Sequence, residues 1–331
     1  AYEISACLVG SEMCIRDRPC VRAAYTRSGA GIHCGGLEIK EISFMLKTNR
    51  DRLVMQSVTG KVHNPTVRGG VYRVTTEGKP VAYPTVGAIC YNVTLGDSVF
   101  GWVGDHIEPD VSTQNADSAE NGAYNFLSCI GNRARVISGD AKGREGFVTG
   151  THGGIEHVIV WFDRETKELL APDDKILVKS FGQGLEIEGF EDIRVMNIDP
   201  DLFEKLNIKI GDGRLSVGVR AVIPARFMGS GIGSQAFSGD YDIMTASKGE
   251  LNEYGIDKLR FGDLVFLQDC DTVFGREYLK GSGTVGVVIH SDCLISGHGP
   301  GVTTVLSCKT ERLSAFVDEN ANIGKMLGAV K

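Results

Sequence analysis

The sequence predicts a mainly β protein with many tight turns. Glycine accounts for 43 of 331 residues, aromatic residues make up only 8%, and runs with helical periodicity are few. Glycine adopts the left-handed backbone of tight turns without steric penalty, so this composition favours short strands joined by turns. With 42% apolar residues the chain can also build a core, which excludes a disordered protein.

A recurrent phrase, in which Gly-Asp precedes alternating apolar residues, predicts individual turn and strand units. It occurs as YNVTLGDSVFGW, as IKIGDGRLSVGV and as LRFGDLVFLQD, with a variant in LAPDDKILVKSFGQG. The phrase has no fixed period. We therefore do not expect a solenoid or a propeller.

Helical signals are few. In IDPDLFEKLNI, Asp199 is a suitable N-cap and Pro200 suits the first turn, which predicts a short helix. The tail from Glu311 to Leu327 has broken apolar spacing that predicts one or two short helices. We expect an N-terminal β domain over residues 45–190 and a C-terminal β-rich domain over residues 191–331.

The first 44 residues are expected to lie outside this fold. Residues 1–18, AYEISACLVGSEMCIRDR, resemble a translated sequencing adapter, because LVGSEMCIRD back-translates to the transposon end of such an adapter. Residues 19–44 read as a translated upstream leader or, alternatively, as a flexible arm. AAG GAG codons for Lys40-Glu41 would form a ribosome-binding sequence at start-site spacing from Met45. We therefore expect Met45 to open the native protein.

Charge and cysteine usage limit the partners. The formal net charge of −7 disfavours nucleic acid and anionic membrane surfaces as partners. No apolar run approaches the roughly 18 residues of a membrane-spanning helix, so we expect no membrane partner. The five cysteines from Cys90 onward are scattered and contain no CxxC, which predicts free thiols in a reducing cytoplasm. Strand edges make a homo-oligomer plausible.

Residues 131–162 resemble the KOW segment of small SH3-like barrels, in which a glycine permits a tight bend between two strands. In that family the segment binds RNA, and here Arg133, Arg135, Lys142 and Arg144 would supply positive charge. Neighbouring acidic residues dilute that charge, so the alternative is a barrel corner with solvated side chains. Both interpretations predict an SH3-like β-barrel.

Four clusters could carry chemistry, and the first is the GDHIEP phrase. Asp105, His106 and Glu108 lie within four residues. On a strand, His106 and Glu108 would point to the same face, and imidazole with carboxylate suits Zn²⁺, Mn²⁺ or Fe²⁺. We name Asp105 and His106 as candidate metal ligands and Glu108 as a candidate catalytic group. The alternative is a turn in which Asp105 bonds the backbone and His106 packs.

The second cluster is THGGIEH. Its two histidines, His152 and His157, flank two glycines at a spacing that fits a hairpin and could bring the side chains together. The spacing differs from the one-turn helical spacing of HExxH metalloenzymes. The alternative is a pair of solvent-facing loop histidines.

The third cluster, VGVVIHSDCLISGHGPGV, follows an apolar strand. His290 and His298 are candidate catalytic groups, and His298 is also a candidate metal ligand. Cys293 is a candidate nucleophile or soft metal ligand, although burial as an apolar residue is the alternative. Three glycines could expose amides to an anionic ligand, namely Gly297, Gly299 and Gly301.

The fourth cluster is MGSGIGSQAFSGDYDIM. Four of its residues could bind a carboxylate or phosphate through backbone amides, namely Gly229, Ser230, Gly231 and Gly233. Asp240 and Asp242 could add oxygen ligands for a metal on one strand face. The alternative is a flexible loop followed by an edge strand.

Nine phrases, in chain order, resemble the bacterial and archaeal family DUF4438: TNRDRLV, GDHIEP, LSCIGN, SGDAKG, GFVTG, MNIDPDLFEKL, MGSGIG, DYDIM and GHGPGV. The resemblance extends from about Met45 to the C-terminus. It implies a mostly β architecture that combines an SH3-like barrel with a layered β-sandwich. The family name carries no established function, so the resemblance assigns no catalytic residues.

Two kinds of function remain open at this point. One is a metal-assisted hydrolase or lyase of a small polar, amide-like molecule, with a divalent Zn, Mn or Fe ion that polarises a carbonyl or activates water. The other is a noncatalytic barrel that binds RNA, a protein partner or a small ligand. Convergence of His106, His290 and His298 would favour the enzyme, and wide separation would remove it.

Overall fold

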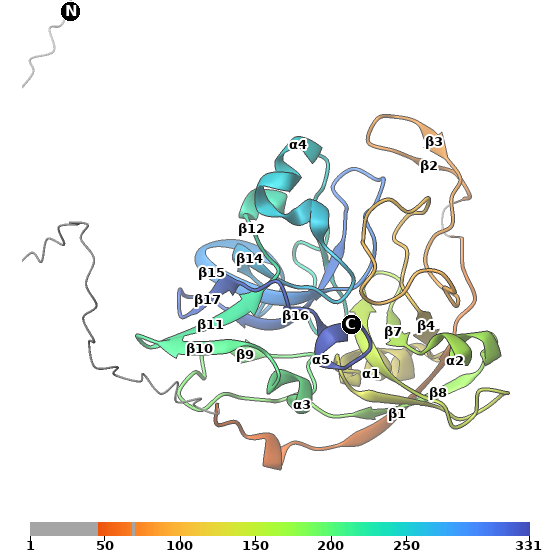
Figure 1. Ribbon diagram of the computed structural model, residues 1–331, viewed down its shortest axis with the longest axis horizontal. Coiled ribbons are helices and arrows are strands. Elements are labelled where there is room, and N and C mark those ends of the chain that lie inside the picture. Colours follow the sequence, from red (N-terminus) through yellow and green to blue (C-terminus); the bar gives the residue numbers. More distant parts are fainter. Residues whose placement is uncertain (1–45, 68–69) are drawn as a thin grey trace, which may run out of the picture. The chain divides into compact units, whose positions relative to one another are not determined.

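Strands dominate residues 46–67 and 70–331, which are the residues that the computed structural model describes (Figure 1). The segments 1–18 and 19–44, for which we predicted an adapter and a leader, lie outside the described residues. Residues Met45–Lys331 form one compact unit.

Six antiparallel strands close into a barrel in the order β1-β4-β7-β6-β5-β8. They are β1 (Gln56–Val62), β4 (Val111–Gln114), β5 (Arg133–Val136), β6 (Glu145–His152), β7 (His157–Trp161) and β8 (Lys175–Ser180). Alternation explains the closure, because β5 buries every second residue and those residues enter the barrel core. The predicted barrel is thus present.

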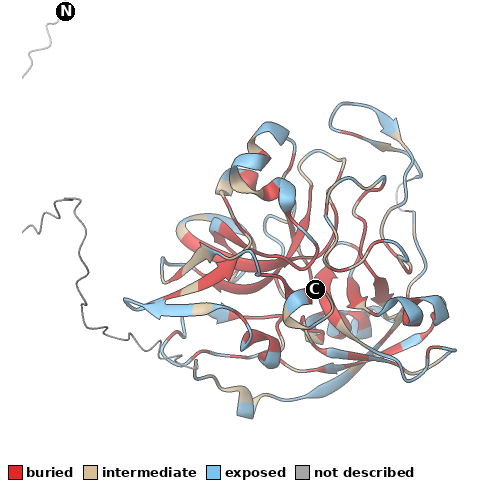
Figure 2. Cartoon of the chain, in the orientation of Figure 1, coloured by how far each residue is buried: buried red, intermediate tan, exposed pale blue. Residues whose placement is uncertain are grey.

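The C-terminal half is built from two sheets. The larger has the order β12-β14-β15-β16-β13, with β9 also paired to β16, and the smaller has the order β10-β11-β17. The larger sheet comprises β9 (Arg194–Val195), β12 (Ala221–Ile223), β13 (Tyr241–Asp242), β14 (Leu264–Asp271), β15 (Glu277–Val288) and β16 (Gly301–Cys308). The smaller comprises β10 (Ile208–Gly211), β11 (Arg214–Val219) and β17 (Leu313–Val317). A hairpin of β2 (Arg73–Val74) and β3 (Pro80–Val81) stands apart and is largely exposed (Figure 2).

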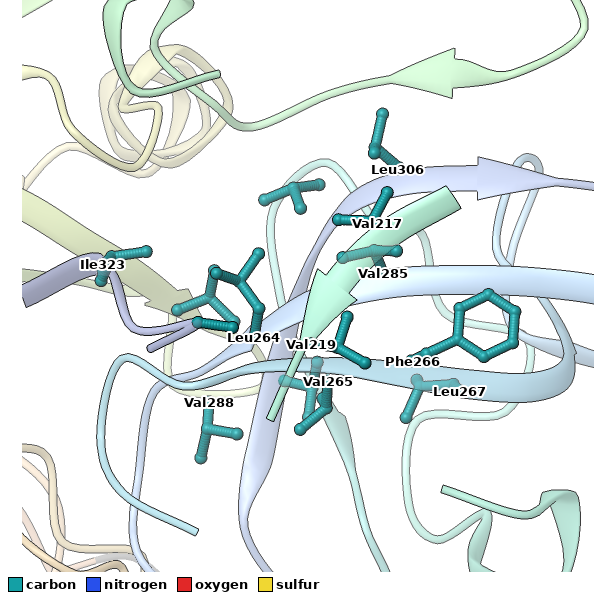
Figure 3. Packing of buried hydrophobic residues seen from close by; sticks show 14 of the residues in the cluster. Val217, Val219, Leu264, Val265, Phe266, Leu267, Val285, Val288, Leu306 and Ile323 are labelled. Carbon is teal, nitrogen blue, oxygen red and sulfur yellow. The ribbon is translucent and has the colours of Figure 1, made fainter. Parts of the chain in front are cut away.

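The two sheets share one apolar core. Val217 and Val219 of β11 pack in the same cluster as Val265 of β14 and Val285 of β15 (Figure 3). Burial of apolar side chains between sheets is the main stabilising contribution of such a layered arrangement. The mainly β class, with a barrel and layered sheets, is therefore confirmed.

Helices are short. They are α1 (Ser118–Leu127), α2 (Arg164–Leu169), α3 (Pro200–Phe203), α4 (Lys248–Leu251) and α5 (Ile323–Met326), with 3₁₀ turns at η1 (Arg50–Arg52), η2 (Ala225–Phe227), η3 (Asn252–Tyr254) and η4 (Ile256–Lys258). The predicted helix after Asp199 is present, because its side chain accepts a hydrogen bond from the Asp201 amide and Pro200 occupies the first turn.

Two local predictions are wrong. The tail forms a strand at Leu313–Val317 before its short helix, because this segment pairs in parallel with β11 and extends the smaller sheet. The phrase YNVTLGDSVFGW contributes no strand, since residues 91–102 are turns and bends with a single bridge from Ser98 to Arg260. Tertiary context decides both cases.

The five described cysteines are free. Among the described residues, no helix has the length and apolar character required to cross a membrane.

Candidate metal centre

The histidines of the described chain gather in one network. They are His63, His106, His152, His157, His290 and His298. The His106 ring centroid lies 5.0 Å from that of His290 and 5.2 Å from that of His298. His106, His290 and His298 therefore converge. This is the arrangement that we expected to favour an enzyme over a noncatalytic barrel.

His106 is held in an uncommon backbone conformation. Its φ is 52°, in the left-handed region that non-glycine residues rarely adopt, and such strain concentrates at functional sites. Its Nδ1 lies 3.2 Å from Asp105 Oδ2, and burial lowers the pKa of His106, which favours the neutral imidazole that a metal requires. The predicted strand is absent here, because residues 101–110 form turns and bends.

His290 lies two residues after the end of β15 and is fully buried. Its Nδ1 donates a hydrogen bond to the carbonyl of Ser291 at 2.8 Å, so Nε2 is left to face the site. Nε2 lies 2.9 Å from Asp240 Oδ2 and 3.4 Å from Asp242 Oδ1. Burial alone would lower the pKa of His290, but the two carboxylates outweigh it and raise that pKa well above its usual range. This position therefore favours a positive charge.

Asp240 Oδ2 and His290 Nε2 form an ion pair at 2.9 Å but lack the geometry of a hydrogen bond. Both atoms are buried, and neither has a hydrogen-bond partner among the described residues. Buried polar atoms without a hydrogen bond are uncommon, and a bound water or ion is the usual explanation. Gly301 permits the arrangement, because an added Cβ would lie 2.0 Å from Asp240 Oδ2 and 2.2 Å from His290 Nε2.

His298 approaches the same carboxylate from the other side. Its Nδ1 lies 2.6 Å from Asp242 Oδ2 and 3.3 Å from His106 Nε2. The bond to Asp242 raises the pKa of His298. Burial alone would raise the pKa of Asp242, but its bonds to His290 and His298 outweigh burial and lower it.

Glu108 lies behind His152 and joins the hairpin histidines. Its fully buried carboxylate accepts hydrogen bonds from His152 Nδ1 at 2.6 Å and from His157 Nδ1 at 2.9 Å. Burial alone would raise the pKa of Glu108, but His157 and His152 outweigh it and hold that pKa well below its usual range. Glu108 thereby leaves Nε2 of His152 as the atom available to a ligand. It does not line the cavities described below.

The hairpin expected from THGGIEH is present. His152 and His157 are direct cross-strand partners in β6 and β7. They are buried at 6% and 0% exposure, so the alternative of two solvent-facing histidines is wrong. His157 Nε2 continues the network to His63 Nδ1 at 3.1 Å.

Cys293 is a buried thiol beside the cluster. Its Sγ donates to Asp105 Oδ1 at 2.9 Å and accepts from the Ile295 amide at 3.2 Å. Burial and the Asp105 carboxylate raise the pKa of Cys293 far above that of a free thiol. This environment disfavours a thiolate nucleophile, although a metal ion could still displace the proton.

Two donor groups could hold a metal ion. One is His106, Cys293 and His298, and the other is His152, Asp240 and His290, with the donor atoms of each group within 4.8 Å of one another. Asp240 and Asp242 flank Tyr241 around β13, so they point to the same side, as the sequence predicts. Asp105 and Glu108 instead lie behind the nitrogen donors, where they orient His106 and His152.

A polar cavity of about 390 Å³ opens above these groups. Its lining includes His106, His152, Asp240, Asp242 and His298. A second cavity of about 200 Å³ also contains His106 and His152 in its lining. Two donors of each group therefore lie where a small molecule can reach them, whereas the buried His290 and Cys293 line neither cavity.

The glycine-rich loop of the fourth cluster, Gly229 to Gly233, offers fewer free backbone amides to a ligand than we predicted. Ser230 and Gly231 line the larger cavity. The amides of Gly229, Ser230 and Gly233, however, donate to backbone carbonyls, so they are not free to bind an anion. Gly299 serves close packing, because a Cβ there would lie 1.9 Å from the Ile243 carbonyl oxygen.

The other two glycines of the third cluster line neither cavity. Gly297 has a left-handed φ of 81°, and its carbonyl accepts from the Ser230 amide. Gly301 instead supplies the space between Asp240 and His290.

Sequence reasoning missed Arg276. This side chain is 2% exposed, and its Nη1 donates to the carbonyls of Ser230 at 2.7 Å and Asp242 at 2.9 Å. Arg276 therefore holds the glycine-rich loop against β13. No motif marked it, because it lies far from both segments in sequence.

The basic residues of the KOW-like segment lie on the barrel, in β5 and the β5–β6 loop. Arg133, Arg135, Lys142 and Lys179 line a cavity of about 230 Å³ that shares no lining residue with the two metal-centre cavities. The barrel is present, and the likeness to a KOW module stays a prediction.

Comparisons with known proteins agree on one family. Two family models match, described as Domain of unknown function (DUF4438), N-terminal, over residues 72–204, and Domain of unknown function (DUF4438), C-terminal, over residues 205–327. A solved structure described as "Crystal structure of TM1086" is 47% identical, with a TM-score of 0.82, over 85% of this chain and 99% of that chain. No curated protein matches. The chain belongs to the DUF4438 family.

Proposed function

We propose that this chain is a metal-dependent hydrolase of a small, polar, amide-like substrate. The convergence of His106, His290 and His298 beside a polar cavity carries the proposal. The Nδ1 atoms of His106 and His290 face Asp105 and the Ser291 carbonyl. Metal-binding histidines typically have their remote nitrogen held in this way, because the partner fixes the tautomer and the ring orientation.

A divalent ion among these donors would supply two kinds of chemistry. It lowers the pKa of a bound water toward neutrality, and it polarises a substrate carbonyl. In amide hydrolysis the water oxygen forms a bond to the carbonyl carbon and the C–N bond breaks. The departing nitrogen takes up the proton that the water loses, so water is the only co-reactant.

The cavity indicates the size and charge of the substrate. About 390 Å³ lies near the lower end of the range of small-molecule sites. Among the described residues, its lining contains no lysine or arginine, although Arg73 lines the second cavity, which shares His106 and His152 with it. Serine, glutamine and backbone groups of the lining suit a neutral polar molecule.

Metal analysis of the full chain tests the proposal. The protein is purified without chelator, and bound Zn, Mn and Fe are measured beside the His106→Ala and His298→Ala variants. We expect bound metal in the wild type and less metal per chain in both variants. His63→Gln is the matched control, because His63 bonds to His157 outside both donor groups. A folded, metal-free wild type after reconstitution would contradict the proposal.

Activity is measured on a panel of short primary and secondary amides by release of ammonia or amine. We expect turnover that chelation abolishes and added metal restores. Metal binding without turnover on any small amide or ester would favour a ligand-binding sensor over an enzyme.

The basic barrel cavity supports a second candidate function. Arg133, Arg135, Lys142 and Lys179 line it together with a single acidic residue, Glu145. Such a patch could contact RNA phosphates. Fluorescence anisotropy with a labelled single-stranded RNA tests this, with the Arg133→Ala/Lys142→Ala double variant for comparison. Binding that weakens with salt and in the double variant would support an RNA-binding role, and absence of binding at low salt would remove it.

A further inference from the structure

Asp242 directs its two carboxylate oxygens toward different histidines. Oδ1 lies 3.4 Å from His290 Nε2, whereas Oδ2 lies 2.6 Å from His298 Nδ1 and 3.9 Å from His106 Nε2. The side chain is only 8% exposed, so its orientation is fixed by these neighbours. A carboxylate placed in this way can bridge two cations.

We infer that the centre holds two divalent metal ions with Asp242 as the bridging ligand. This inference rests on the proposed function and specifies how its metal centre is built. The first ion takes donors from His152, Asp240, His290 and Asp242 Oδ1, and the second takes donors from His106, His298 and Asp242 Oδ2, with Cys293 Sγ beside them.

The donor separations suit metal coordination. Ligands bound at about 2.1 Å lie roughly 3.0 to 3.5 Å apart in octahedral or tetrahedral geometry. His290 Nε2 lies 2.9 Å from Asp240 Oδ2 and 3.4 Å from Asp242 Oδ1. On the other side, His106 Nε2 and His298 Nδ1 are 3.3 Å apart. Each ion thus has a preformed pair of donors on its own side of Asp242.

The number of buried carboxylates around the centre suits more than one ion. The side chains of Asp105, Glu108, Asp240 and Asp242 are at most 8% exposed. Among the described residues, these four carboxylates form ion pairs only with histidines and none with lysine or arginine. Buried carboxylates are retained when they are paired or coordinate metals. With the histidines neutral, as metal ligands are, two divalent ions would match the charge of the four carboxylates.

A second observation points to a ligand independently of charge. The buried Nε2 of His290 and Oδ2 of Asp240 have no hydrogen-bond partner among the described residues. Gly301 keeps the adjoining space free of a side chain. An ion bound between them would satisfy both atoms at once.

Two ions would divide the chemistry of hydrolysis between them. Paired metals about 3.5 to 4 Å apart can activate a shared water and hold the oxygen of the substrate. Imidazole-rich donors with a nearby thiol favour Zn²⁺ or Fe²⁺ over Mg²⁺ or Ca²⁺, while the carboxylates also suit Mn²⁺. The proposed function then becomes hydrolysis at a centre that holds two metal ions.

Metal counting on the full chain tests the inference. The protein is stripped with chelator, reconstituted with Zn²⁺ or Mn²⁺, desalted and analysed for metal per chain. We expect two ions in the wild type and in His63→Gln, about one in His298→Ala, and about one in His152→Ala. One ion in the wild type would overturn the dinuclear inference while the proposed function stands. No ion would overturn both.

Electron paramagnetic resonance of the Mn²⁺-loaded wild type needs no variant and covers the case in which one fails to fold. We expect an exchange-coupled spectrum at two Mn²⁺ per chain, and uncoupled Mn²⁺ at that loading would overturn the bridge. The Asp242→Asn variant should lose the coupling. Retention of the coupled spectrum in that variant would also overturn the assignment of Asp242.

Discussion

Replacing Gly301 with alanine tests whether the space between Asp240 and His290 holds an ion. The added Cβ would lie 2.0 Å from Asp240 Oδ2 and 2.2 Å from His290 Nε2, whereas real Cβ atoms essentially never approach a neighbour within 3.0 Å. The two donors must therefore retreat by about 1 Å. Metal sites tolerate deviations of about 0.2 Å in their bond lengths, so the ion on this side is expected to be lost.

The expected magnitude has two parts. Overpacking a close-packed interior costs about 1 to 3 kcal/mol of unfolding free energy, and the metal-free variant should lose this amount. An ion present at 100 times its dissociation constant stabilises the folded state by about 2.7 kcal/mol. Gly301→Ala should lose the stabilisation that one ion provides. The difference in unfolding free energy between the wild type and the variant should therefore increase when metal is added.

Chemical unfolding of the wild type and Gly301→Ala, with and without Zn²⁺, measures both parts, and metal analysis counts the ions. Gly211→Ala is the matched control, because no atom lies within 4 Å of its added Cβ and, like Gly301, it has no left-handed backbone. If Gly301→Ala binds the wild-type number of ions and gains the same stability from Zn²⁺, the argument is refuted.

Three further predictions concern groups around the site and in the core. Glu108→Gln should weaken metal affinity by about 10- to 100-fold in a metal titration, because it removes the charge that orients His152. Lys167→Met should cost about 3 to 5 kcal/mol in urea unfolding, because Lys167 Nζ lies 3.0 Å from the buried carboxylate of Asp110, which would lose its cation. Burial raises the pKa of Asp263 to about 6, so its carboxyl stabilises the fold at low pH and that contribution disappears as the pH rises through 6. The unfolding free energy of the wild type minus that of Asp263→Asn should fall by up to about 3 kcal/mol between about pH 3.5 and 7, and a flat difference would contradict the shift.

Local patterns predicted the fold where local chemistry determines structure. Asp-Gly in IKIGDGRLSVGV gives a hairpin, because Asp212 and Gly213 both adopt positive φ between β10 and β11. Helix α1 was missed for a physical reason. It buries Asn121, Tyr124 and Asn125, two of which are polar, so no apolar periodicity marks it. Asn121 and Asn125 instead donate to the Glu156 carbonyl, a contact that no short sequence window contains.

Residue type predicted the donors of the site better than their roles. His106, Asp240, Asp242, His290 and His298 were all recognisable as candidate ligands or catalytic groups, and all of them meet. Their meeting depends on long-range packing, which composition and spacing do not encode in a single chain. The left-handed backbone of His106 was equally hidden, because a strand and a strained turn are both compatible with GDHIEP.

The division of the donors between the two halves of the chain has a mechanistic consequence. His106 and His152 belong to the part matched by the N-terminal family model, whereas Asp240, Asp242, His290 and His298 belong to the part matched by the C-terminal one. Each donor group combines ligands from both parts, so neither part carries a complete site. Thr151 and Thr303 also exchange hydrogen bonds across this junction, at 3.0 and 3.2 Å, beside the hairpin that carries His152. An ion bound to both parts would stabilise their association, so under the proposed function metal removal should loosen this junction before it unfolds either core.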